Sequence, residues 1–138
     1  MTPIYYWAAG FVDGEGCITV HKNSNNSHIL RLQVDSTTPS VLGVLHGLFG
    51  GRVNGPYNRG QYKDSYNRRP IWVWSACGKE ALSALEKIEP YLLVKREQAQ
   101  LALSFPPPNK RGPRIRTSEE VWNRREEIRL QLQVEKRL

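Results

Sequence analysis

The sequence predicts an α+β fold in which helices and pairs of strands alternate along 138 residues. Strand segments show apolar and polar alternation, or many β-branched and aromatic residues, at 17–22, 28–35 and 70–76. Helical segments repeat apolar residues at helical spacing over 38–49, 79–88 and 90–105. With a first helix near the N-terminus and a weaker strand at 52–59, the expected order is αββαββα. This order implies an antiparallel sheet with helices on one face and the other face free.

The first helix is expected to begin at Thr2-Pro3, because a hydroxyl residue followed by proline is a helix-start signal. One apolar face follows from the spacing of Ile4, Trp7, Ala8, Phe11 and Val12. A second face has small side chains that would let another helix approach closely: Tyr6, Ala9, Gly10 and Asp13. Gly14 and Gly16 end the helix and flank Glu15, which leaves an acid at the helix tip.

The C-terminal part differs in composition from the rest of the chain. A core is expected over residues 1–105, followed by a basic, Pro-rich linker over 106–118 that begins with three prolines. A last helix, expected over 119–138 as part of the same domain, has a capping signal and a thin apolar stripe. The stripe consists of Val121, Ile128 and Leu132, broadened by Trp122 and Leu130. Docking on the core and binding to a partner both remain open for this helix.

The charge is basic and unevenly distributed. Twenty Lys and Arg oppose thirteen Asp and Glu, for a net charge of +7, and residues 51–75 hold five bases against one acid. Clustered positive charge favours a nucleic-acid partner, although composition does not separate DNA from RNA. The two cysteines and three histidines show no zinc-ligand spacing, and no apolar run approaches the ~20 residues of a membrane span. We therefore expect a soluble, intracellular protein without a membrane partner.

The segment Ala8 to Gly16 resembles the motif after which the LAGLIDADG homing endonucleases are named. Alanine, glycine, two apolar residues, an acid, a small residue, an acid and a glycine follow in the family's order. Ala8, Gly14 and Glu15 are the departures from the usual motif. Phe49-Gly50-Gly51 and residues 90–99 also match the family, so the resemblance covers roughly residues 4–104. The resemblance does not extend to residues 105–138.

The resemblance implies a homing endonuclease that cuts both strands of a long, nearly palindromic DNA duplex across the minor groove, leaving 3′ overhangs. Family members with a single motif are homodimers, so the face of Tyr6, Ala9, Gly10 and Asp13 is the expected dimer interface. Symmetry would bring two Glu15 carboxylates together, where Mg²⁺ is the expected cofactor because it prefers oxygen ligands. Mn²⁺ is expected to substitute, and Ca²⁺ to bind without supporting cleavage.

The resemblance also implies roles for single residues near the helix tip. Glu15 is the matching metal-binding catalytic acid, and the backbone carbonyl of Gly14 adds a ligand. Lys95 matches a base that the family places near the scissile phosphate. Ser36 aligns with a position where relatives often carry a polar residue that positions water, such as glutamine. The side chain of serine is shorter than that of glutamine. Asp13 is expected to support the helix ends and the dimer interface rather than to bind metal.

Strand alternation predicts which side chains reach from the free sheet face to DNA. The first hairpin presents Thr19, His21, Arg31, Gln33 and Asp35, and arginine and glutamine can address guanine and adenine in the major groove. The surface would be extended by Arg52, Asn54, Arg59, Lys63, Arg68 and Arg69. Phosphate contacts are expected from the linker residues Lys110, Arg111, Arg114 and Arg116. The face presented by residues 71–75 is left open, although Trp72 and Trp74 are more natural in a core.

Three other functions use the same fold. A maturase would bind intron RNA, a transcription regulator would bind DNA without cutting it, and a degenerate copy would have lost activity. Glu15 and Lys95 argue against the last two, because a pure binder has no need for paired carboxylates facing phosphates. An added maturase role stays open, as does the compartment, either the cytoplasm of a prokaryote or a mitochondrion or chloroplast.

Overall fold

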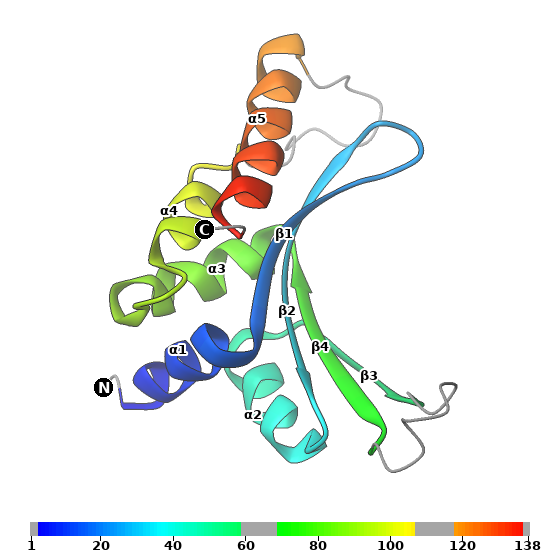
Figure 1. The fold of residues 1–138 in the computed structure, drawn as a ribbon, viewed down its shortest axis with the longest axis vertical. Coiled ribbons are helices and arrows are strands. Elements are labelled where there is room, and N and C mark those ends of the chain that lie inside the picture. Colours follow the sequence, from blue (N-terminus) through cyan, green and yellow to red (C-terminus); the bar gives the residue numbers. More distant parts are fainter. Residues whose placement is uncertain (1–2, 59–68, 107–117, 137–138) are drawn as a thin grey trace.

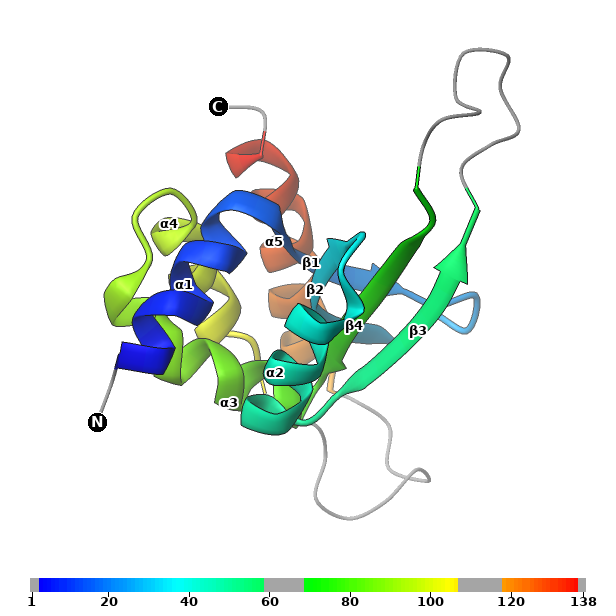
Figure 2. The ribbon, with the colours of Figure 1, turned by 90° about the horizontal axis from the view of Figure 1, so that it is seen from below.

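A computed structural model describes residues 3–58, 69–106 and 118–136. Its four antiparallel strands form one sheet in the order β1-β2-β4-β3: β1 (Gly16–Lys22), β2 (His28–Ser36), β3 (Arg52–Tyr57) and β4 (Ile71–Cys77). The helices are α1 (Pro3–Glu15), α2 (Pro39–Phe49), α3 (Lys79–Ile88), α4 (Arg96–Leu103) and α5 (Glu119–Glu135). They cover one side of the sheet and leave the other side open (Figures 1 and 2). The predicted α+β fold is confirmed.

The covered face of the sheet forms the centre of the hydrophobic core. Its alternate strand residues are buried, with Ile18 and Val20 from β1, Leu30, Leu32 and Val34 from β2, and Trp74 and Ala76 from β4. Because successive side chains of a strand point to opposite faces, Val73 and Ser75 lie on the open face. Trp72 packs against the core beside Trp74. Residues 71–75 therefore present Trp72 and Trp74 to the core and Val73 and Ser75 to the open face.

The first helix buries only part of the face that its apolar spacing predicts, with Phe11 packed against the core, and it buries Ala9 in addition. Ala8, Ala9 and Val12 are fully buried, whereas Ile4 and Trp7 are 40% and 37% exposed. Small side chains face inward because α1 packs closely against α3 and the short 3-10 turn η1 (Glu89–Tyr91). The prediction that Ala9 faces a second copy of the chain is therefore wrong, since a residue without exposed surface cannot reach a partner.

The helix predicted over 90–105 begins later than expected. Residues 89–91 form η1, residues 92–95 are not helical, and α4 begins at Arg96. The non-helical stretch is held by the carboxylate of Asp13, which accepts hydrogen bonds from the backbone N–H groups of Leu93 and Lys95 at 2.8 and 3.0 Å. These long-range hydrogen bonds keep residues 92–95 out of the helix that their local sequence pattern predicts.

The last helix docks on the body of the protein, against β1 and α4. Ile128 and Leu132 are buried as the predicted stripe requires, Val121 and Trp122 are half-buried, and Leu130 is exposed, so it does not broaden the stripe. Docking on the core is thus what the structure shows for this helix. None of the helices in the described part of the chain has the length and apolar character to cross a membrane. The linker cations Lys110, Arg111, Arg114 and Arg116 lie outside the described residues.

Candidate functional site

The end of α1 places Glu15 and Gly14 at the surface. Both residues are exposed, and Glu15 is the last residue of the helix, directly before β1. This abrupt change from helix to strand requires glycine at position 16, because a Cβ atom there would lie 2.7 Å from the Val12 carbonyl oxygen. Helix carbonyls carry partial negative charge at a C-terminus, so a carboxylate at this point creates a site suited to a cation.

Lys95 is held at the same end of α1. Its ammonium Nζ donates a 2.7 Å hydrogen bond to the Asp13 carbonyl oxygen, and its backbone N–H binds the Asp13 carboxylate. Helix ends leave carbonyl groups without helical partners, and here a lysine satisfies one of them. The expected role of Asp13 in supporting the helix end agrees with these contacts. The structure therefore places Lys95 at the end of α1 that carries Glu15, although the two residues are far apart in sequence.

Glu15 lines a groove of about 490 Å³ together with Asp35 and Ser36 from the end of β2. The groove continues onto Phe11, Thr37 and Ile71. The Ser36 hydroxyl accepts a 3.0 Å hydrogen bond from the Thr38 backbone N–H, so part of its capacity supports the turn before α2. Asp35 accepts a 3.2 Å bond from the Gln33 amide. Asp35 thus adds a second carboxylate to the groove that Glu15 lines, whereas strand alternation predicts for Asp35 only a place on the free face of the sheet.

The oxygen donors of this region fit a hard divalent cation, because Mg²⁺ prefers carboxylate and carbonyl oxygens. One chain supplies the Glu15 carboxylate and the backbone carbonyl of Gly14, and glycine adds no side chain to obstruct the approach. Within the described residues, no three His, Cys, Asp or Glu side chains gather into a metal-binding group. A single chain thus offers a partial ligand set for such a cation.

The open face of the sheet carries the polar set predicted from strand alternation. Thr19 pairs with Arg31 across β1 and β2, Gln33 pairs with Ser75, and Asp35 with Val73. Ser75 and Val73 in turn pair with Arg52 and Asn54 of β3, which places those residues on the same face. Neither Arg31 nor Arg52 has an ion-pair partner among the described residues. His21 and Arg69 are exposed, and Arg59, Lys63 and Arg68 lie outside the described ranges.

The face of α1 that remains open matches the predicted one only in part. Tyr6 contacts Tyr91 with ring centroids 4.3 Å apart but is still 59% exposed, whereas Asp13 binds the 92–95 segment of its own chain. Gly10 stays on the open face with Gly14, and a Cβ atom at either position would meet nothing within 4 Å. Trp7 lies on this face one turn before Gly10. Beyond the helix end, Leu93 and Val94 are 81% and 71% exposed.

Sequence reasoning missed the contacts that hold these elements in place. The bonds from Leu93 and Lys95 to Asp13 join positions 80 and 82 residues apart. A polar network between α5 and the β1–β2 hairpin spans up to 104 residues. Its only sequence signal is the helical spacing of Trp122, Glu126 and Arg129 on one side of α5.

Comparisons with known proteins were made for the sequence and for the fold. No protein-family model matches the chain. The DNA endonuclease I-CvuI of Chlorella vulgaris is 29% identical over 121 residues, which are 80% of this chain and 70% of that protein. Crystal structures of I-CvuI with DNA targets, in the presence of Ca²⁺ or Mg²⁺, match with TM-scores of 0.58 and 0.59 at 27% identity. Each match covers 74% of this chain and 64% of the I-CvuI chain, so the chain spans less than two thirds of that structure.

More distant structures support the same fold. The archaeal intron-encoded homing endonuclease I-Vdi141I, complexed with DNA, matches over 96% of this chain and 83% of its own, with a TM-score of 0.62 at 15% identity. The LAGLIDADG meganuclease I-AabMI matches over 70% of this chain and 33% of its own, with a TM-score of 0.54 at 16% identity. The chain is thus similar in sequence to the DNA endonuclease I-CvuI and shares the fold of the LAGLIDADG homing endonucleases.

Proposed function

We propose that this protein is a homing endonuclease that cuts a long, nearly palindromic DNA duplex as a homodimer. The observation that carries the proposal is the exposed Glu15 at the tip of α1, which lies directly before an open sheet face that carries Arg31 and Arg52. The relative I-CvuI is a DNA endonuclease, which supports the same reaction here. The activity requires access to genomic DNA, so the cytoplasm of a prokaryote or an organelle remains the expected compartment.

The dimer interface that the structure favours is the open face of α1. Gly10 and Gly14 lie one turn apart on that face, where two helices can approach more closely than the usual ~8–10 Å between axes. Trp7, Leu93 and Val94 supply exposed apolar surface around them. A two-fold axis through this face places the two α1 ends together, and with them the two Glu15 carboxylates.

The cofactor that fits these residues is Mg²⁺. Glu15 and the Gly14 carbonyl would hold it, and when bound it would supply positive charge for the attacking water and the leaving 3′ oxygen. Two close carboxylates repel each other, so a cation between them also stabilises the dimer interface. We expect Mn²⁺ to substitute for Mg²⁺, and Ca²⁺ to bind without supporting cleavage.

The remaining residues bind and position the DNA. Arg31 and Gln33 on the open face have the donors that read guanine and adenine, with about 1–3 kcal/mol of discrimination for each good bidentate pair. The Lys95 ammonium, held at the α1 end, offsets the negative charge that develops on the phosphate. Ser36 and Asp35 line the groove at Glu15 and would position solvent there.

The test separates DNA binding from cleavage at Glu15. Glu15→Gln keeps the size of the side chain and removes its charge, so cleavage in Mg²⁺ should fall by orders of magnitude. Affinity in EDTA should hold or rise, because two negative charges beside the phosphates are gone. The matched control is Glu86→Gln, at an exposed position on α3. The duplex bound by I-CvuI and a pool of randomised duplexes serve as probes.

The outcomes distinguish the candidate functions. Cleavage by Glu15→Gln within about tenfold of wild type, only ~1.4 kcal/mol of barrier, would refute the catalytic role. A wild-type protein that binds duplex DNA but never cuts it would support a regulator or a degenerate copy. Preference for a structured intron RNA over every duplex would support a maturase.

A further inference from the structure

We propose that α5 positions the loop between β1 and β2, residues 23–27, for contact with DNA, and that Trp122 is the residue that fixes this loop. The inference rests on the proposed DNA-binding function. It gives the C-terminal helix, which lies outside the sequence stretch 4–104 that resembles the family, a part in target recognition.

The loop is a tight polar turn with a defined conformation. The Asn23 N–H donates to the Ser27 carbonyl at 2.8 Å, and the Asn26 N–H donates to the Asn23 carbonyl at 2.9 Å. Asn26 has a φ of 67°, a left-handed conformation that asparagine tolerates better than most residues. The Trp122 indole N–H donates to the Asn26 carbonyl at 2.8 Å, so α5 holds the residue with the least common backbone conformation in the loop.

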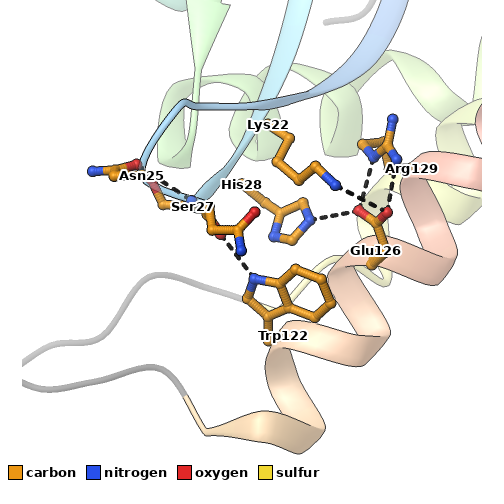
Figure 3. A network of polar contacts seen from close by, with 8 residues as sticks. Lys22, Asn25, Ser27, His28, Trp122, Glu126 and Arg129 are labelled. Atoms are coloured by element: carbon orange, nitrogen blue, oxygen red, sulfur yellow. Dashed lines mark hydrogen bonds and ion pairs between the residues drawn. The ribbon is translucent and has the colours of Figure 1, made fainter.

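The base of the loop is held by Glu126, one helical turn after Trp122 (Figure 3). Its carboxylate accepts a 2.9 Å contact from His28 Nε2, and Lys22 Nζ lies 3.4 Å away. Lys22 and His28 are paired residues, one on each strand next to the loop. His28 is only 6% exposed, so this contact is largely shielded from solvent.

Glu126 is kept ionised by its own helix. Two nitrogens of Arg129 donate to it at 2.8 and 2.7 Å. These bonds, followed by the bond from His28, hold the pKa of the Glu126 carboxyl well below its ordinary range. The Glu126 carboxylate that Lys22 and His28 contact is therefore negatively charged at neutral pH.

The ring of Trp122 packs into the same junction. Lys22 Nζ lies 5.8 Å from the ring centroid, within the range of a cation–π contact, and the His28 ring meets Trp122 edge-on at 5.1 Å. Lys22 and His28 at the base of the loop and the Asn26 carbonyl within it thus all contact one side of α5. This helix runs beside β1 (Figure 1).

The position of the loop indicates which part of a DNA target it would reach. β1 begins directly after Glu15 and has seven residues, so the loop lies about 23 Å from the α1 tip at ~3.3 Å per residue. At 3.4 Å per base pair, this corresponds to roughly seven base pairs from the site of cleavage. A loop already held in one conformation loses less freedom on binding, which raises affinity at these outer positions.

The experiment compares Trp122→Phe, which keeps a ring but loses the indole N–H, with Asn123→Ala at a neighbouring exposed position on α5 as the control. The probe is a duplex selected from the randomised pool by wild-type protein, with single base changes along its length. We expect Trp122→Phe to bind it up to about tenfold more weakly, the loss of roughly one hydrogen bond. Base preference should relax only about seven base pairs from the cut, and the single-turnover cleavage rate at saturating protein should stay unchanged.

Hydrogen exchange of the loop amides gives a readout that does not depend on DNA. Residues 23–27 should exchange faster in Trp122→Phe, with the rest of β1 and β2 unchanged, and Asn123→Ala should match wild type. Unchanged loop exchange would overturn the positioning role, and so would a loss of affinity spread evenly over all base positions. Wild-type protein that binds no duplex would refute the proposed function and, with it, the DNA role of the loop.

Discussion

The bonds between Asp13 and the 92–95 segment make Asp13→Ala the most informative single change. Its carboxylate accepts bonds of 2.8 and 3.0 Å from two backbone N–H groups, and the Lys95 ammonium rests on its carbonyl. Hydrogen bonds to a charged group contribute about 1.5–3 kcal/mol each, and the lower end applies here because the site is partly exposed. For the two bonds together we therefore expect a loss of about 3 kcal/mol in the free energy of unfolding.

The loss in the free energy of unfolding should depend on how many hydrogen-bond acceptors remain in the side chain at position 13. Asp13→Asn keeps one acceptor oxygen but sets an amide N–H donor against the second backbone N–H, so it should lose at least half as much as Asp13→Ala. Cleavage should fall more than DNA affinity in both variants, because the backbone N–H of Lys95 loses or weakens its bond to the side chain of residue 13, and only the bond from the ammonium to the backbone carbonyl still holds Lys95 at the α1 end.

Urea unfolding followed by circular dichroism measures the effect, with Glu86→Ala as the charge-matched control on an exposed surface. The measurement is repeated at two protein concentrations, because a dimer adds concentration-dependent stability. If Asp13→Ala is within about 0.5 kcal/mol of the control, the size of a typical surface effect, the two bonds do not hold the segment and the reasoning fails.

Two further changes test the interface and the α5 network. Gly10→Leu should convert the dimer to folded monomers in sedimentation, because a side chain there meets nothing within its own chain but would force two helices apart; a leucine variant that sediments as a dimer contradicts this interface. Glu126→Gln should destabilise the protein at pH 7. Because folding lowers the pKa of Glu126, the stabilisation is present above its ordinary value of about 4.3 and is lost as pH falls below that. The difference between wild type and Glu126→Gln in urea midpoint should therefore shrink from pH 7 to pH 3, and a constant difference would contradict the assignment.

Local sequence patterns were sufficient for the order of elements and for the open sheet face. The strand alternation of residues 28–35 predicted β2 within one residue of its observed end, and the same alternation placed Arg31 and Gln33 on the free face. Period-two alternation is a property of the strand itself, so it survives folding unless the register slips. Gly14-Glu15-Gly16 likewise marked the end of α1 and the acid at its tip.

Tertiary structure alone decided which side of α1 is buried, where α4 begins and what α5 does. The apolar spacing of α1 included Ile4 and Trp7, but packing on α3 and η1 buries Ala8, Ala9 and Val12 and leaves Ile4 and Trp7 partly exposed. The start of α4 depends on a carboxylate about 80 residues earlier, and the contact of Trp122 with the β1–β2 loop joins residues 96 positions apart. Periodicity reports only on neighbours along one element, whereas burial and hydrogen-bond partners depend on residues that folding brings from distant parts of the chain.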